Sequence, residues 1–464
     1  MDLTDKLLAA IDADHDAAVG RLVEWLRIPS ISAQPDHAAD CVRAAEWVRD
    51  QLVAIGFTAS LRQTPKHPVV VAHHPGPATG AKAPHLLYYG HYDVQPPDPL
   101  ELWTSPPFEP VIVDGPHGKR VVARGAVDDK GQTLMWIEAM RAWHSIAGGP
   151  PCAITAVIEG EEEIGSPNLA PFMAANSAEL AADVAIISDT GMWDIDTPAL
   201  STRLRGMVFV QLDIKAANRD LHSGMYGGSA LNPNNLITKI LGDLHDAEGR
   251  VQLPGFYDGI PEVSPELRAQ WQALGFSEHD FLGAIGLSVP VGEKGRGALE
   301  RLWARPTADI NGIWGGYTGP GSKTVIPSEA HAKITFRLVP GQHHDKVFDA
   351  FKQFVHARLP ADATASFQGG SASPGIEVPA DSGFVTAARV ALADEYGKPA
   401  AMIGCGGSIP VVSSLKDVLG LDTVLMGFGL EDDQVHSPNE KFDMRCFHQG
   451  TRSHARLLAR LASA

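Results

Sequence analysis

The sequence predicts a layered α/β domain that is interrupted by a smaller, two-layer α+β domain of the ferredoxin-like type. The chain has 464 residues, more than a single ordinary hydrophobic core organises. Short apolar runs alternate with helical patterns in both end portions of the chain, which is typical of a layered α/β domain. In the middle, half-exposed strands and helices follow one another in the order strand, helix, strand, helix, strand, which indicates a two-layer α+β unit.

The end portions carry the strands and helices expected of the α/β domain. Short apolar runs predict buried strands, and longer stretches with helical periodicity predict helices. The expected strands are Val69–Ala72, Leu86–Tyr89, Ala153–Ile158, Val184–Ile187 and Thr423–Met426. The expected helices are Asp5–Leu26, His37–Ile55, Gln132–Ile146, Ser382–Tyr396 and Cys446–Leu461.

The middle of the chain predicts the inserted domain. Met207–Lys215 and Ala332–Val339 alternate as half-exposed strands do. Helices are expected at about 234–245 and 344–357, and the segment NGIWGGYTGPGSKTVIP is expected to be a loop. We therefore expect the α/β domain over residues 1–206 and 379–464, with the insertion at 207–378.

Composition excludes several classes of partner. The formal net charge of −17 argues against nucleic acid and against an anionic membrane surface. The N-terminus reads as an acidic amphipathic helix instead of a signal peptide, and no run of about 18 apolar residues predicts a membrane span. The four cysteines form no CxxC pair, so we expect a reducing, cytoplasmic location.

Side chains with metal-binding chemistry follow several of the expected strands. In YYGHYDVQP, His91 and Asp93 lie two residues apart, so that they point the same way and suit a metal ligand and the acceptor for its ring N–H. In RGAVDDKGQ, an Asp doublet that includes Asp128 precedes a helix. Each pattern has an ordinary alternative, because strand-end His and Asp are common at surfaces and one Asp suits a helix N-cap.

An acidic run forms the most distinctive pattern. VIEGEEEIGS places four glutamates within the five positions 159–163, directly after an apolar strand. A solvated acidic turn is the ordinary alternative. However, buried strands deliver their carboxyl ends to a site crevice, and carboxylates clustered there repel one another unless cations offset them. AIISDTG adds Asp189 and VHSPNEK adds His436, and such carboxylate and imidazole sets without thiolates suit zinc, manganese or cobalt.

The order of these motifs resembles a known family. HYDVQP, RGAVDDKG, EGEEEIGS, SDT, LRG, HSG, KTVIP, RLVP and HSPNE follow the order seen in the M20 metallopeptidases, closest to the cytosolic non-specific dipeptidase and carnosinase group. The resemblance extends from about Leu22 to the last helix. It implies a catalytic α/β domain of the zinc-peptidase type, with the insertion as a lid and dimerisation domain.

The resemblance implies a site for two divalent metal ions, with zinc expected and manganese or cobalt accepting the same ligands. Asp128 would bridge both ions. His91 and Asp189 would complete one ligand shell, and Glu163 and His436 would complete the other.

The resemblance also implies the groups around the metals. Glu162 would be the general base, Asp93 would orient His91, and the peptide between Asp128 and Asp129 would be cis. The EEE run leaves a second register, in which Glu161 and Glu162 take the two roles. Alignment on the following Gly-Ser favours Glu162 and Glu163.

The inserted domain would supply further groups. By resemblance, His222 would reach the partner's active site across a homodimer interface and stabilise the oxyanion, although an exposed loop histidine is the ordinary reading. A strand-face salt bridge is the alternative role for Arg337, and helix capping is the alternative for Ser408. The candidate substrate-binding residues are Arg337, Lys323, Asn311, Gly407 and Ser408.

Together these features predict a metallohydrolase that cleaves the amide bond of dipeptides. An N-acyl- or N-carbamoyl-amino-acid amidohydrolase could use the same metal site on a different substrate. A metal-dependent binding protein without catalysis is the third alternative, and it would need the metal ligands but not Glu162.

Overall fold

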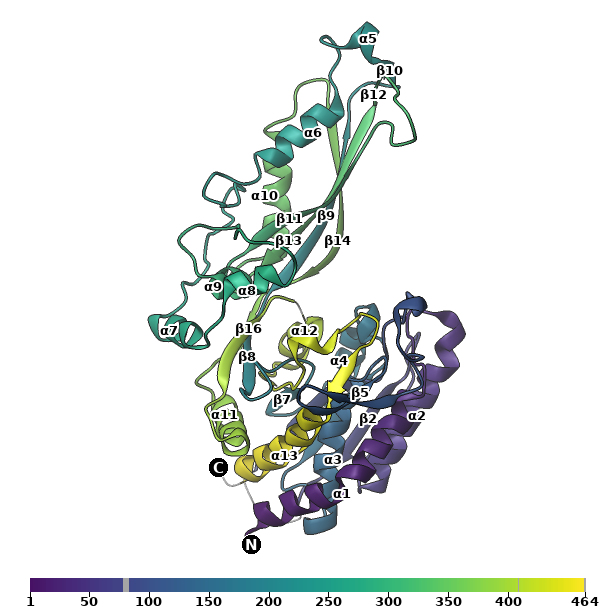
Figure 1. Cartoon of the computed structure of the whole chain (residues 1–464), viewed down its shortest axis with the longest axis vertical. Coiled ribbons are helices and arrows are strands. Elements are labelled where there is room, and N and C mark those ends of the chain that lie inside the picture. The colour runs from purple at the N-terminus through teal and green to yellow at the C-terminus, as the bar shows by residue number, and fades with distance from the viewer. Residues whose placement is uncertain (78–82, 408, 463–464) are drawn as a thin grey trace. The chain divides into compact units, whose positions relative to one another are not determined.

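The structure, a computed structural model, describes residues 1–77, 83–407 and 409–462 (Figure 1). The chain divides into two compact units. Unit 1 contains Met1–Thr202, Val378–Ile403 and Pro410–Ala464, and unit 2 contains Arg203–Glu377 and Gly404–Ile409. Each unit is described by itself below.

Unit 1 is built on a six-stranded sheet. Its order is β1 (Thr58–Arg62), β2 (Val69–His74), β6 (Ile154–Glu159), β3 (Leu86–His91), β7 (Val184–Ile187) and β17 (Thr423–Leu425). The first three strands pair antiparallel, whereas β6, β3, β7 and β17 run parallel. These parallel strands are buried along their whole length. Because they run in the same direction, their carboxyl ends meet at one edge of the sheet.

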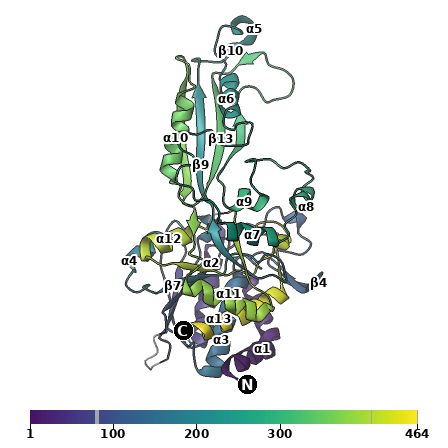
Figure 2. The ribbon, with the colours of Figure 1, turned by 90° about the vertical axis from the view of Figure 1, so that its left-hand side faces the viewer.

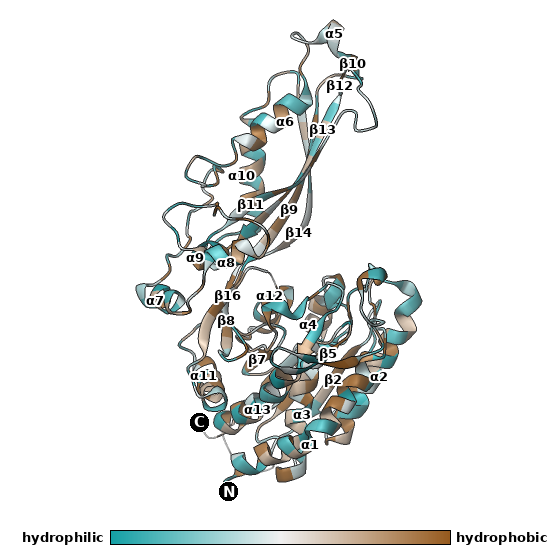
Figure 3. Cartoon of the chain, in the orientation of Figure 1, coloured by the Kyte–Doolittle hydropathy of each residue, from teal (hydrophilic) through white to brown (hydrophobic). Residues whose placement is uncertain are grey.

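Helices with one apolar side cover this sheet, as the alternating colours along them in Figure 3 show. The ring of Tyr88 on β3 stacks on Trp136 of α3, with centroids 4.1 Å apart. A capping box between Asp2 and Asp5 begins α1. The larger helices of unit 1 are α1 (Leu3–Leu26), α2 (Ala38–Ala54), α3 (Lys130–Ala147), α11 (Gly383–Tyr396) and α13 (Met444–Leu461), and the shorter ones are α4 (Leu169–Ala175) and α12 (Pro410–Leu419).

Two small sheets were not expected from the sequence. One has the order β18 (Lys441–Asp443), β5 (Gly118–Val122) and β4 (Val111–Gly115). The other has the order β15 (Ile376–Glu377), β8 (Ala199–Leu204) and β16 (Ala401–Cys405). The β4 strand is only half-buried, so its sequence lacks the apolar run that marks the strands of the central sheet.

Unit 2 contains a four-stranded antiparallel sheet with helices α6 (Pro233–Gly242) and α10 (His344–His356) running alongside it (Figure 2). The strand order is β11 (Thr307–Trp314), β13 (Glu329–Leu338), β9 (Gly206–Lys215) and β14 (Thr364–Ser373). Every second residue of β9 and β13 is buried in the core that these helices share with the sheet. The α/β fold class with an α+β insertion is therefore confirmed.

The expected loop NGIWGGYTGPGSKTVIP is wrong at both ends. Its first residues, Asn311 to Trp314, belong to β11, and Val325–Ile326 forms β12, which pairs with β10 (Leu221–His222). A β-bulge between Ile310 and Gly312 interrupts the alternation that would have marked β11. The remaining helices of unit 2 are α5 (Ser223–Tyr226), α7 (Pro265–Ala273), α8 (Glu278–Gly283) and α9 (Ala298–Trp303). No helix in the described part of the chain is long and apolar enough to span a bilayer.

Replacing Phe351 by Ala is expected to lower the free energy of unfolding of unit 2 by about 3–5 kcal/mol. Phe351 is fully buried, and its ring lies 5.3 Å from that of Phe336, so its loss leaves a cavity between α10 and the sheet. Urea denaturation measures the change. The matched control is Phe281→Ala in the same unit, where the side chain is 36% exposed and the cost should stay below about 1 kcal/mol. Equal losses in both variants would contradict this description of the core.

Candidate metal centre

Three neighbouring strands of the central sheet deliver polar side chains to one edge. His91 is the last residue of β3, the turn with Glu162 and Glu163 follows β6, and Asp189 follows β7. Because β6, β3 and β7 are parallel neighbours, these side chains converge where the strands end. This convergence is the arrangement that their positions after apolar runs predicted.

Two further segments complete the cluster. Asp128 lies in the turn between β5 and α3, and His436 lies in the loop between β17 and β18. The Asp doublet precedes helix α3, as expected, and the strand before it, β5, ends at Val122 and belongs to a small sheet. The peptide between Asp128 and Asp129 is cis, as expected.

The ligand atoms form two sets that share Asp128. One set contains His91, Asp128 and Asp189, and the other contains Asp128, Glu163 and His436, with the candidate ligand atoms of each set within 4.8 Å of one another. The two oxygens of Asp128 face different imidazoles. Its Oδ1 lies 3.2 Å from His91 Nε2, and its Oδ2 lies 3.0 Å from His436 Nε2.

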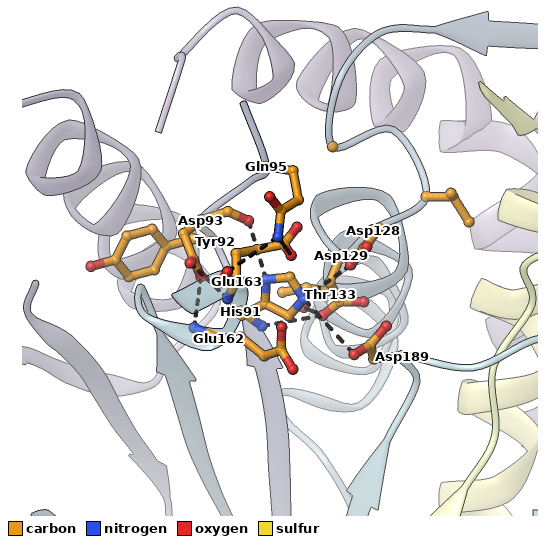
Figure 4. A network of polar contacts seen from close by, with 12 residues as sticks. His91, Tyr92, Asp93, Gln95, Asp128, Asp129, Thr133, Glu162, Glu163 and Asp189 are labelled. Carbon is orange, nitrogen blue, oxygen red and sulfur yellow. Dashed lines mark hydrogen bonds and ion pairs between the residues drawn. The ribbon is translucent and has the colours of Figure 1, made fainter. Parts of the chain in front are cut away.

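The outer carboxylates lie close to the same imidazoles. His91 Nε2 is 3.9 Å from Asp189 Oδ2, and His436 Nε2 is 3.1 Å from Glu163 Oε2. A carboxylate that offers one oxygen to each of two neighbouring ligand sets has the geometry of a bridge. Figure 4 shows His91 between Asp93, Asp128 and Asp189.

Burial makes this cluster electrostatically costly. Burial, together with the neighbouring charges, raises the pKa of Glu162 to about 9, of Glu163 to about 7 and of Asp189 to about 6. For Asp128, burial acts in the same direction, but the imidazoles of His436 and His91 beside its carboxylate hold its pKa below its usual value. These acids can therefore be ionised together only when positive charge lies among them.

The residues present fit a pair of divalent cations. His91 is fully buried, and its Nε2 is not aligned for a hydrogen bond with any described group, although Asp128 lies near it. A metal ion is a natural partner for such a nitrogen. Carboxylates and imidazoles without thiolates form the ligand set of an open hydrolytic site.

Asp93 contacts both the glutamate turn and the His91 ring. Its carboxylate is buried and accepts hydrogen bonds from the backbone N–H of Glu162, at 3.3 Å, and of Glu163, at 3.1 Å. His91 Nδ1 lies 3.1 Å from the backbone carbonyl oxygen of Asp93 and 3.4 Å from its Oδ1. Asp93 therefore holds the glutamate turn with its carboxylate and orients the His91 ring chiefly through its backbone.

The three consecutive glutamates have different surroundings. Glu161 is buried and bonded elsewhere: its Oε1 accepts from Thr64 Oγ1 and His67 N, and its Oε2 accepts from Asn168 Nδ2. The carboxylate of Glu162 lies beside the His91 ring (Figure 4). Glu163 faces His436.

Three further residues form hydrogen bonds with the predicted ligands or their turns, and the sequence analysis did not predict these roles. Gln95 Nε2 donates to Glu163 Oε2 at 2.8 Å, and Asp129 Oδ2 accepts from His91 N at 3.2 Å and from Thr133 Oγ1 at 2.7 Å. Glu440 accepts hydrogen bonds from the turn that carries Asp128. All three lie within one to four residues of a predicted ligand, and this proximity is the signal that could have identified them.

The predicted oxyanion and substrate-binding residues lie in unit 2, and most of their side chains are exposed. His222 is exposed on β10, and its Nδ1 accepts a hydrogen bond from Gly224 N at 3.0 Å. Lys323 is exposed, with its Nζ 6.0 Å from the ring centroid of Tyr317. Asn311 Oδ1 accepts from Thr335 Oγ1 at 2.5 Å.

The other three candidates are Arg337, Gly407 and Ser408. Arg337 is half-buried on β13, and it forms no ion pair with a carboxylate within 4.0 Å among the described residues. Gly407 N donates to Cys405 Sγ at 3.4 Å. Ser408 lies outside the described residues.

Comparison with known proteins gives consistent matches over the whole chain. The model of peptidase family M20/M25/M40 matches residues 87–460. The chain is 30% identical to the Cys-Gly metallodipeptidase dug1 of Schizosaccharomyces pombe, over 99% of this chain and 98% of that protein. It is 28% identical to the Beta-Ala-His dipeptidase of Homo sapiens, over 99% of this chain and 93% of that protein.

Solved structures give the same result. The di-peptidase Dug1p from Saccharomyces cerevisiae has a TM-score of 0.82 at 26% identity, with 100% of both chains covered. Human carnosine dipeptidase 1 has a TM-score of 0.80 at 27% identity, again with 100% of both chains covered.

The family match spans both ligand sets, from His91 to His436. The resemblance drawn from the sequence motifs, including the dipeptidase and carnosinase branch, is therefore confirmed. The chain belongs to the peptidase family M20/M25/M40 and is a hydrolase that acts on peptide bonds.

Proposed function

We propose that this protein is a dinuclear, metal-dependent dipeptidase. The observation that carries the proposal is the position of Asp128, whose two oxygens face His91 and His436 while Asp189 and Glu163 lie near the same imidazoles. The dipeptide substrate is supported by the relatives, which are named as Cys-Gly and Beta-Ala-His dipeptidases. The ligand types suit zinc, and manganese or cobalt would accept the same residues.

The metals and Glu162 would divide the chemistry. A pair of divalent cations bound by these ligands would polarise the scissile carbonyl and lower the pKa of the attacking water. The Glu162 carboxylate would accept a proton from that water and later donate it to the leaving amine nitrogen. The contacts of Asp93 with the backbone of Glu162 and Glu163 would hold the base in place during both transfers.

His222 would stabilise the negative charge that develops on the carbonyl oxygen. In the neutral ring, the bond that Nδ1 accepts from Gly224 N leaves the proton on Nε2, so the exposed ring presents an N–H donor. Such a donor is worth about 3–4 kcal/mol in the transition state. We propose that it acts in the partner's active site, which would make the functional form a homodimer with the insertion, at 207–378, as its dimerisation and lid domain.

The substrate would be held through its free carboxylate. Arg337 forms no ion pair with a carboxylate among the described residues, and a guanidinium can form a bidentate pair with a substrate carboxylate. Backbone N–H groups near Gly407 and Ser408, together with Asn311 and Lys323, would line the same pocket. We expect the enzyme to work in the cytoplasm on small peptides.

Chelation is expected to abolish dipeptide hydrolysis, and two equivalents of zinc per chain are expected to restore it, because both ligand sets must be filled. The measurement is metal content by plasma mass spectrometry together with ninhydrin assay of Cys-Gly and Ala-Gly cleavage. A parallel panel of N-acetyl, N-succinyl and N-carbamoyl amino acids serves as the control. Preference for the acylated set would overturn the dipeptidase proposal, and ligand binding without any hydrolysis would favour a binding protein.

Glu162→Gln is expected to keep both metals and to lower kcat at least about 100-fold, because the amide cannot accept the proton from water. Steady-state kinetics and metal analysis on the same sample test this. The matched control is Glu161→Gln, whose side chain bonds to Thr64 and Asn168 and should leave kcat within about threefold. The opposite result, with activity lost only in Glu161→Gln, would select the other register.

Arg337→Met is expected to raise KM for dipeptides at least about tenfold, because a charge-assisted bond to the substrate carboxylate is lost. For dipeptide amides, which lack that carboxylate, the variant and the unmodified enzyme should differ little. Arg389→Met provides the control, since Arg389 is an exposed arginine on α11 of unit 1. An unchanged KM for free dipeptides would remove Arg337 from the substrate site.

A further inference from the structure

Two consecutive charged residues, Glu440 and Lys441, lie buried just after the loop that carries His436. Their relative exposures are 0% and 2%, and neither belongs to the two ligand sets. A buried charge persists only where partners compensate it. The partners of these two residues therefore indicate what they hold in place.

Glu440 binds the turn that carries Asp128. Its Oε1 accepts hydrogen bonds from the backbone N–H of Val127, at 3.0 Å, and of Asp128, at 3.2 Å. Its Oε2 accepts from Gly125 N at 2.9 Å and from Arg124 Nη1 at 2.8 Å. Both oxygens are thus occupied by donors from one turn, and the backbone N–H of the bridging aspartate is among them.

Lys441 binds the segment at which the His436 loop begins. Its Nζ donates to Asp432 Oδ1 at 2.9 Å, to Asp433 Oδ1 at 2.6 Å and to Asp443 Oδ2 at 2.6 Å. These three carboxylates also have the spacing of a cation site, but the lysine ammonium already lies among them. Asp433 Oδ2 in turn accepts from Leu430 N at 2.6 Å, which fastens the short helix at Glu431–Asp433.

The conformation of the His436 loop requires stabilisation by such contacts. Gln434, His436 and Asn439 have φ values of 56°, 62° and 64°, a region that is unfavourable for residues other than glycine. The His436 side chain is 53% exposed, so packing alone does not fix it. Asn439 adds contacts to Thr104 and to the carbonyl of Leu102, and Glu440 and Lys441 then end the loop in β18.

We propose that Glu440 and Lys441 form a brace that holds two ligand loops in place independently of the metals, which rests on the proposed dinuclear site. Glu440 is the positioning residue for Asp128, and Lys441 is the positioning residue for His436. Because the residues are adjacent in the chain, they also tie the two loops to each other. The brace lowers the conformational cost of binding the cations, since the ligands are already near their bound positions.

The two halves of the brace have different consequences. Asp128 belongs to both ligand sets, so losing the Glu440 contacts should weaken the binding of both metal ions. His436 belongs to one set only, so losing the Lys441 contacts should weaken the binding of one ion and leave the affinity for the other unchanged. General destabilisation of the fold predicts no such difference between the ions.

Cobalt titration of the full-length, metal-free protein tests the brace, with the visible spectrum of each bound cobalt ion and chelator competition giving the affinity of each site. Glu440→Gln keeps the shape but turns an amide NH₂ towards N–H donors, and it should weaken both sites about 10- to 100-fold. Lys441→Met is combined with Asp433→Asn, so that no three-carboxylate site remains to bind a third ion. This double variant should weaken one site about 10- to 100-fold and change the other less than about threefold.

Two controls match these changes. Glu395→Gln removes a buried carboxylate that binds Arg452 and Arg456 on α13, away from both loops. Lys416→Met with Asp422→Asn removes an exposed ion pair of 2.8 Å. Circular dichroism of each metal-free variant establishes that it is folded. Both controls should bind two cobalt ions with unchanged affinity.

The outcomes separate the brace from the proposed function. If the unmodified protein binds fewer than two ions, the dinuclear site itself is wrong. If it binds two ions and both brace variants keep its affinities, the brace is wrong. Equal weakening in Glu395→Gln and Glu440→Gln would also overturn the proposal, because it would show a general effect of losing a buried carboxylate.

Discussion

The main physical constraint on the site in unit 1 is the repulsion among carboxylates that are buried together at one edge of the central sheet. Glu162, Glu163 and Asp189 are all less acidic than ordinary carboxyl groups, because burial and each other's charges oppose their ionisation. A fold gains nothing in stability from such a cluster in the absence of cations. The same residues suit cation binding, which would offset this cost and would link the arrangement of the strands to the chemistry of the site.

Much of this cluster was predictable because its signal is local. An apolar run that ends directly before a polar residue marks the carboxyl end of a buried strand, and His91 and the glutamate turn both follow such runs. Asp189 follows a third run in the same way. For the choice between Glu161 and Glu162, the only local signal was the distance from the following Gly-Ser. The contacts of Glu161 with Thr64 and Asn168 are present only in the folded chain.

The missed features depend on contacts over long distances in the chain. Strand β5 lacks a continuous apolar run, so the small sheet that contains it was not expected. Glu440 binds backbone N–H groups that lie 312 to 315 positions away, and a backbone donor leaves no trace in the residue types of the sequence. In unit 2, the strand β11 was missed because a bulge next to Gly312 breaks the period of two.

Unit 1 compensates two clusters of carboxylates in different ways, and the segment around His436 takes part in both. Among Asp432, Asp433 and Asp443, the chain supplies its own cation, and these carboxylates raise the pKa of Lys441 although burial opposes this. Around Asp128 and Glu163, the nearest basic groups are imidazoles, which can release their protons and serve as ligands. The lysine ammonium is part of the chain, whereas an imidazole that has released its proton can bind a metal ion. In the proposed brace, Lys441 therefore holds the segment at which the His436 loop begins, while the His436 imidazole remains able to act as a ligand.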